Sequence, residues 1–147
     1  MWRALMTWCL TVGVLCGCGS DAEIPTLLVT DDCSLTGPAT LEEGTARLTL
    51  QRSGLGDYGA ALVLIPEGHT TGDLEDHFAG VSPKWDDRPD WVRLRYVVQV
   101  DDTDVNSVSG DTVLMSLEPG SHAVVCIDYS DDSAEVAADV IVTANDG

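Results

Sequence analysis

The side chains best suited to chemistry are carboxylates gathered in short acidic segments. The longest segment, residues 101–111, reads Asp-Asp-Thr-Asp-Val-Asn-Ser-Val-Ser-Gly-Asp. Its alternating oxygen donors Asp102, Asp104 and Asn106 imitate the start of an EF-hand loop, which holds Ca²⁺ through carboxylate and amide oxygens. However, Ser107 occupies the position that needs glycine, and no glutamate closes the loop. We therefore expect a charged turn here, with calcium binding as the alternative.

The three histidines are the other candidate ligands. His69 and His77 are eight residues apart, so they could share a face with Asp73 and bind a transition metal. Their spacing matches no specific ligand pattern, and we expect them to be solvent-exposed. For His122, which lies in a strand pattern, we expect a packing role. No nucleophile triad, paired-acid site or phosphate loop can be assembled, so we expect neither enzymatic activity nor a cofactor.

Two tryptophans, Trp85 and Trp91, bracket the acidic loop at 86–90. A pair of exposed tryptophans can hold a sugar or form the centre of a protein interface. In the alternative interpretation they pin a long loop onto the domain. We expect the loop at 81–91 to be the contact surface for a surface protein or a glycan.

Charge and length limit the kinds of protein this can be. The chain has 147 residues, with 25 acidic against 7 basic side chains and a formal charge of −18. No basic surface is available to displace counterions from phosphates, which argues against a nucleic-acid partner. The hydrophobic content of 44% is too high for a disordered acidic tail. One folded domain fits the length.

The first 17 residues predict an export signal. One early cation, Arg3, precedes an apolar run that is too short to span a bilayer comfortably. The run ends in Leu15-Cys16-Gly17-Cys18, which resembles the lipobox of bacterial lipoproteins. The resemblance implies cleavage before Cys18 and a lipid on its sulfur, which would anchor the protein in the cell envelope. Gly19 and Ser20 carry no acidic retention signal, so we expect the outer membrane or the cell surface.

Cleavage would change the count of charges and cysteines. It removes one base and no acid, which leaves 25 acidic and six basic residues and a net charge of about −19. Residues 18–25 would form a flexible tether, and residues 26–147 the domain. With Cys18 lipidated, only Cys33 and Cys126 remain, and an even pair in an exported domain is usually bridged. We therefore predict a Cys33–Cys126 disulfide; the alternative is a free thiol that binds a metal.

The remaining sequence reads as one strand after another, with a single helix. Residues 45–51 alternate strictly, and residues 60–65 are apolar on both faces, as in a central strand. Residues 41–44 suggest a turn. Residues 71–79 predict a helix capped by Thr70 or Thr71 and ended by Gly80. In all, the pattern predicts about seven strands, at 26–30, 45–51, 60–65, 92–100, 112–117, 122–129 and 136–143.

One stretch gives a family resemblance. Residues 117–126 look like the "L-x-P-G-x-Y-x-x-x-C" strand of cupredoxins, with His122 in place of the aromatic residue. Residues 44–50 resemble their "aG-x-v-x-v-x-l" strand. Residues 33–38 with Cys126, and residues 66–74, resemble small bacterial lipoproteins of cupredoxin-like build. The resemblance implies an all-β, Greek-key β-sandwich of cupredoxin-like type with one short helix; the alternative is a generic immunoglobulin-like sandwich.

The same resemblance argues against a copper centre. A blue-copper site needs two imidazoles, a thiolate and a weak axial ligand, usually a thioether. Cys126 matches the thiolate position, but Tyr58 stands in the region of the first histidine. Residues 127–136 contain neither histidine nor methionine, and Met115 lies before the cysteine. We therefore expect a membrane-anchored, non-enzymatic binding or structural module without copper; the alternative is a cupredoxin-like protein that handles calcium or a transition metal.

Overall fold

The computed structural model describes residues 23–53, 56–102 and 108–146. The export signal, Cys18, Asp104 and Asn106 lie outside these residues, and so does the side chain of Asp102. The lipid anchor and the calcium site therefore stay predictions. Within the described residues no helix is long and apolar enough to cross a membrane.

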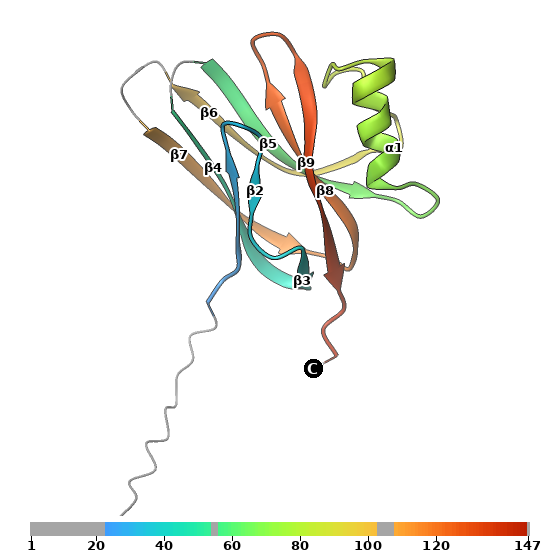
Figure 1. Ribbon diagram of the computed structural model, residues 1–147. Helices are drawn as coiled ribbons and strands as arrows, with labels where there is room; N and C mark the ends of the chain where they lie inside the picture. Colours follow the sequence, from blue (N-terminus) through green and yellow to red (C-terminus); the bar gives the residue numbers. More distant parts are fainter. Residues whose placement is uncertain (1–22, 54–55, 103–107, 147) are drawn as a thin grey trace, which may run out of the picture.

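Two β-sheets make up the domain (Figure 1). The four-stranded sheet has the order β2-β1-β4-β7, and the five-stranded sheet the order β3-β9-β8-β5-β6. The strands of the first are β1 (Thr26–Thr30), β2 (Leu35–Thr36), β4 (Gly44–Ser53) and β7 (Val108–Leu117). Those of the second are β3 (Thr40–Glu42), β5 (Gly56–Ile65), β6 (Arg93–Asp102), β8 (Gly120–Asp128) and β9 (Ser133–Thr143).

The chain passes repeatedly from one sheet to the other. It crosses at each connection from β2 to β5, and again between β6 and β7 and between β7 and β8. Most neighbouring strands are antiparallel, whereas β1 runs parallel to β4 and β3 runs parallel to β9. The predicted all-β sandwich with one short helix is confirmed.

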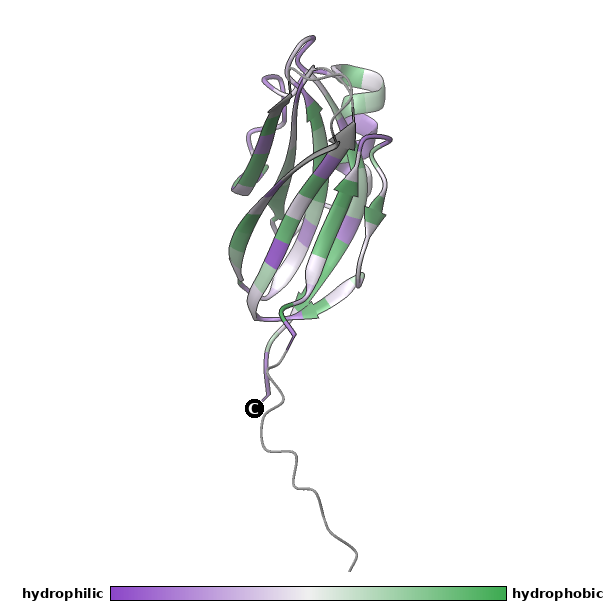
Figure 2. Cartoon of the chain, turned by 90° about the vertical axis from the view of Figure 1, so that its left-hand side faces the viewer, coloured by the Kyte–Doolittle hydropathy of each residue, from purple (hydrophilic) through white to green (hydrophobic). Residues whose placement is uncertain are grey.

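Alternating side chains explain how the sheets pack. In β4, Ala46, Leu48 and Leu50 are buried between the sheets, and the residues between them point to solvent or are only half-buried. The same alternation of apolar and polar residues is visible along several strands in Figure 2. Each buried leucine or valine stabilises the fold because its apolar surface leaves water, by about 1.5–3 kcal/mol per side chain.

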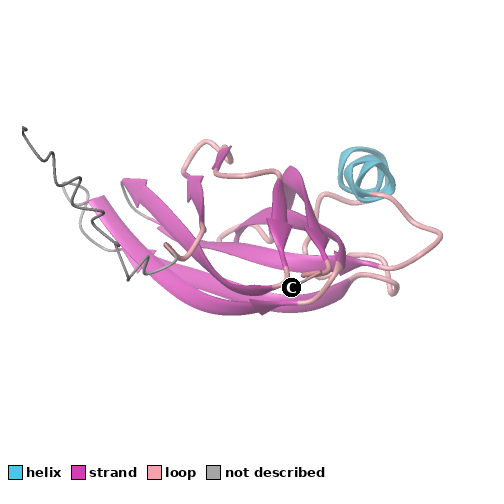
Figure 3. Cartoon of the chain, turned by 90° about the horizontal axis from the view of Figure 1, so that it is seen from below, coloured by secondary structure: helices cyan, strands magenta, loops and turns pink. Residues whose placement is uncertain are grey.

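A second core covers the outer face of the five-stranded sheet. Helix α1 (Thr71–Asp76) continues into a π-helical turn, His77–Val81, and lies beside the sheets when the molecule is seen from below (Figure 3). Leu74 and Phe78 pack here with the outward residues of β5 and β8. These two strands are therefore buried on both faces, which is why residues 60–65 are continuously apolar.

Three local predictions need correction. Leu41 and Glu42, expected in a turn at 41–44, belong to strand β3, because Leu41 is buried in the core and the backbone of β3 pairs with β9. Strands β2 and β3 were not expected, since two or three residues are too few to show a period of two. The helix does not end at Gly80, because a π-type hydrogen bond from the backbone N–H of Ser82 to the carbonyl of His77 extends it.

The start of the helix agrees with the prediction. The hydroxyl of Thr70 accepts a hydrogen bond from the backbone N–H of Asp73 at 3.2 Å, and the carboxylate of Asp73 accepts one from the backbone N–H of Thr70 at 2.7 Å. This reciprocal pair is a capping box, and it satisfies two amide groups near the helix start.

Candidate functional site

A cleft of about 710 Å³ opens where the β1–β2 turn approaches the helix and the β8–β9 hairpin. Its apolar wall comes from both cores and includes Leu50, Phe78 and Val136. Its polar part consists of five carboxylates, Asp31, Asp32, Glu75, Asp128 and Glu135. The volume falls in the range of small-molecule pockets, which are concave and mostly apolar with a few placed polar groups.

The charged side chains of the cleft are all acidic. None of the described residues that line it is a lysine or an arginine. The Thr30 hydroxyl donates a hydrogen bond to Asp32 at 2.5 Å, and this contact, with a smaller one from Ser34, lowers the pKa of the Asp32 carboxyl. Asp32 therefore stays charged at lower pH than an isolated aspartate.

The Cys33–Cys126 disulfide forms one side of the cleft. It joins the turn after β1 to strand β8, so it ties the two sheets together across a separation of 93 residues. The two Cα atoms are 5.8 Å apart. Cys33 adopts a left-handed backbone conformation with φ of 59°, which turns its side chain within a tight turn. The predicted bridge is confirmed, and the sulfur of Cys126 is engaged in it.

The two tryptophans of the 81–91 loop have different environments. Trp85 is only 7% exposed, packs near Phe78, and has the Arg88 guanidinium 4.5 Å from its ring centroid. It pins the loop to the second core and offers no free ring face. Trp91 is half-buried and stacks on His69, with ring centroids 4.2 Å apart.

The histidines are not gathered at one site. His69 stacks on Trp91, whereas Nε2 of His77 lies 2.7 Å from the backbone carbonyl of Asp87. His122 is buried in the sandwich, and burial lowers its pKa. Across residues 23–53, 56–102 and 108–146, no three His, Cys, Asp or Glu side chains converge closely enough to hold a metal ion together.

Sequence reasoning did not identify the cleft. Its carboxylates lie in four separate segments of the chain, and each segment looks like an ordinary acidic turn or strand end. Only the predicted disulfide carried a usable signal, because it brings residues 31–33 next to the end of β8. Residues brought together by long-range pairing leave no local motif.

Fold and cleft together define a disulfide-linked, all-β, Greek-key sandwich with an acidic cleft at one end. No family model matches the chain, and no curated protein matches it. Among solved structures, it is similar to a sodium-dithionite-reduced auracyanin from the photosynthetic bacterium Roseiflexus castenholzii. That alignment has 9% identity and a TM-score of 0.41, and it covers 80% of this chain and 94% of the other.

A second similar structure is auracyanin B, with 12% identity, a TM-score of 0.35, and coverage of 82% of this chain and 91% of the other. Both auracyanins are cupredoxins. The fold class follows from the order of the strands in the two sheets of this chain.

Proposed function

We propose that this chain is a membrane-anchored, exported lipoprotein that acts as a non-enzymatic binding module, and that its acidic cleft binds an organic cation. The observation that carries the proposal is the composition of the cleft. Five carboxylates share a cavity of about 710 Å³ whose described lining residues include no basic side chain. A concave site lined by charges of one sign concentrates ligands of the opposite sign.

The apolar wall favours an amine or a guanidinium on a hydrocarbon stem over a bare metal ion. Calcium needs six to eight oxygens around a single point, whereas these carboxylates are spread over a large cavity. Leu50, Phe78 and Val136 can instead cover methylene groups while the charged ends meet the acids. A polyamine, or lysine side chains of a partner protein, has this chemistry.

The lipobox-like Leu15–Cys18 segment and the export signal before it support the anchor. Metabolic labelling with a radioactive fatty acid tests this part separately. We expect the label on the wild-type chain and none on C18A. Label retained on C18A would refute lipidation at this residue without affecting the proposed cleft.

Isothermal titration with spermidine, a trivalent polyamine, tests the cleft. Glu75 and Glu135 lie in the cleft and are exposed, so E75Q/E135Q removes two charges without disturbing the core. We expect the affinity to fall on the order of tenfold or more, because each lost pair contributes about 1 kcal/mol or more near a protein surface.

The matched control, E67Q/D139N, removes two exposed acids that do not line the cleft. Equal losses of spermidine affinity in both double variants would mean that only the net charge of the protein matters, and would refute the cleft as the site. Absence of spermidine binding to the wild type would also refute it. Calcium binding that is abolished by E75Q/E135Q, without spermidine binding, would favour the metal-handling alternative.

A further inference from the structure

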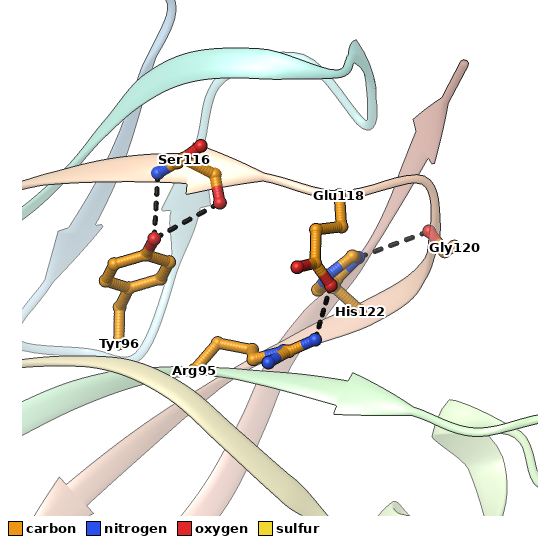
Figure 4. A network of polar contacts seen from close by, with 6 residues as sticks. All are labelled: Arg95, Tyr96, Ser116, Glu118, Gly120 and His122. Atoms are coloured by element: carbon orange, nitrogen blue, oxygen red, sulfur yellow. Dashed lines mark hydrogen bonds and ion pairs between the residues drawn. The ribbon is translucent and has the colours of Figure 1, made fainter.

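A second cavity, of about 130 Å³, lies near the β7–β8 turn, at the end of the sandwich opposite the cleft. Figure 4 shows the polar side chains that surround it, from β6, β7, the β7–β8 turn and β8. Leu62 and Leu117 provide its apolar lining, and the polar lining consists of Arg95, Tyr96, Ser116, Glu118 and His122. No part of the proposed binding function uses this cavity.

A β-bulge places Arg95 at the rim. Leu62 pairs with Tyr96 and the next residue, Val63, pairs with Leu94, so Arg95 has no opposite residue on β5. Bulges of this kind redirect a side chain. The guanidinium donates a hydrogen bond to the Glu118 carboxylate at 2.5 Å, and the two side chains are 37% and 66% exposed. The ion pair can therefore open without disturbing the core.

Tyr96 is fully engaged. Its hydroxyl accepts a hydrogen bond from the backbone N–H of Ser116 at 2.9 Å and donates one to the Ser116 carbonyl at 3.2 Å. These contacts join β6 to β7 and fix one wall of the cavity (Figure 4). The tyrosine oxygen is thus a structural group here and not a candidate ligand.

His122 is the unusual member of the set, because it is only 2% exposed and still has an unused nitrogen. Its Nδ1 lies 3.2 Å from the Gly120 carbonyl oxygen, which can only accept, so Nδ1 carries the hydrogen. Nε2 is then left with a lone pair. In the described part of the chain Nε2 has no hydrogen-bond partner. Buried polar atoms without a protein partner are rare, and water or a bound ion usually takes the partner's place.

We propose that Nε2 of His122 and the carboxylate of Glu118 bind a divalent transition-metal ion such as Zn²⁺. An imidazole whose Nδ1–H is held by a backbone carbonyl presents Nε2 in the tautomer that metal-binding histidines use. Glu118 lines the same cavity and supplies an anionic oxygen. Water would complete the coordination. In the absence of metal Arg95 neutralises Glu118, so this arginine competes with the ion.

Isothermal titration of the chain with ZnCl₂ tests the site. The protein is expressed with its own N-terminus in a bacterial host and purified in detergent. Every variant then carries the same N-terminal cysteines, so any zinc bound by their thiols is the same in each titration. We expect H122N and E118Q each to weaken Zn²⁺ binding by about tenfold or more. R95Q should tighten it, because the competing cation is gone. CaCl₂ should not bind here, since imidazole is a poor ligand for a hard cation.

The control variant H69N/H77N removes the two other histidines. Loss of zinc binding in that variant, with H122N unchanged, would overturn the proposal. Weaker binding in R95Q would overturn the role of the arginine. The H122N substitution is in the core and can unfold it. Glu118 and Arg95 are exposed, so E118Q and R95Q test the site in a folded protein. A zinc-dependent shift of the His122 Nε2 signal in ¹H–¹⁵N NMR is the second required result, and an unmoved signal would refute direct ligation.

Discussion

Loss of the Cys33–Cys126 disulfide should lower the unfolding free energy more than any other change that leaves the core intact. The bridge closes a loop with a sequence separation of 93 residues. For a loop of that length, the chain-entropy relation gives about 4.7 kcal/mol of stabilisation at 25 °C, because the unbridged unfolded chain gains conformations. Unfolding free energies of whole domains are only about 5–15 kcal/mol, so this contribution is a large fraction of the total.

The perturbation is the double variant C33S/C126S, and the assay is urea unfolding followed by circular dichroism. We expect the unfolding free energy to fall by about 4–5 kcal/mol. The corresponding fall in Tm is on the order of 15–20 °C for a domain of this size. Since the bridge acts mainly on the unfolded chain, the secondary structure of the folded variant should be unchanged.

Wild-type protein with and without reductant is the matched control. Reductant should lower the stability of the wild type to that of the double variant and leave the variant unchanged. A loss below about 1 kcal/mol in C33S/C126S would refute the entropic argument. It would mean that the sheets hold the unbridged chain equally well, or that the unfolded ensemble keeps these residues close.

Three further perturbations test other parts of the structure. Burial lowers the pKa of His122, so the unfolded chain takes up a proton that the folded chain excludes. The unfolding free energy should therefore fall as the pH drops below about 6.5, as measured by urea titration with a chelator present. The H122Q variant should show a flatter dependence of unfolding free energy on pH. Replacing Thr70 by Ala breaks the capping box and should cost about 1 kcal/mol in thermal unfolding. Leu48 is completely buried between the sheets, and L48A should cost about 2–5 kcal/mol in urea unfolding, with E67Q as a surface substitution that stays near zero.

The strands were predictable where one face is buried and the other is not. In β1 the buried residues Leu27 and Val29 are two positions apart. In β4 the buried residues Ala46, Leu48 and Leu50 likewise occupy every second position. The helix start was also predictable, since a capping residue acts on amides only three positions away. Local signals therefore suffice for elements whose stabilising contacts are periodic or close in sequence.

Other features depend on distant pairing and could not be predicted. Residues 40–42 form a strand because β9, about a hundred residues later, pairs with them. The acidic cleft is lined by both Asp31 and Glu135, and the small cavity by both Arg95 and His122. A bulge in register decides where Arg95 points, and register is a property of two strands. No pattern within either segment contains that information.

The direction of β1 makes the two ends of the domain different, because the described chain begins at one end and the cleft opens at the other. The strand begins at Thr26 and ends at Thr30, so the disulfide turn lies at the far end of the domain, where the cleft opens. Both described ends of the chain leave from the near end (Figure 1). Residues 18–25 span at most about 27 Å when extended. A lipid on Cys18 would thus keep the end of the domain where β1 begins within that distance of the bilayer. With such an anchor, the acidic cleft would open at the end of the domain away from the attachment point, and the His122 cavity would lie at the end beside it.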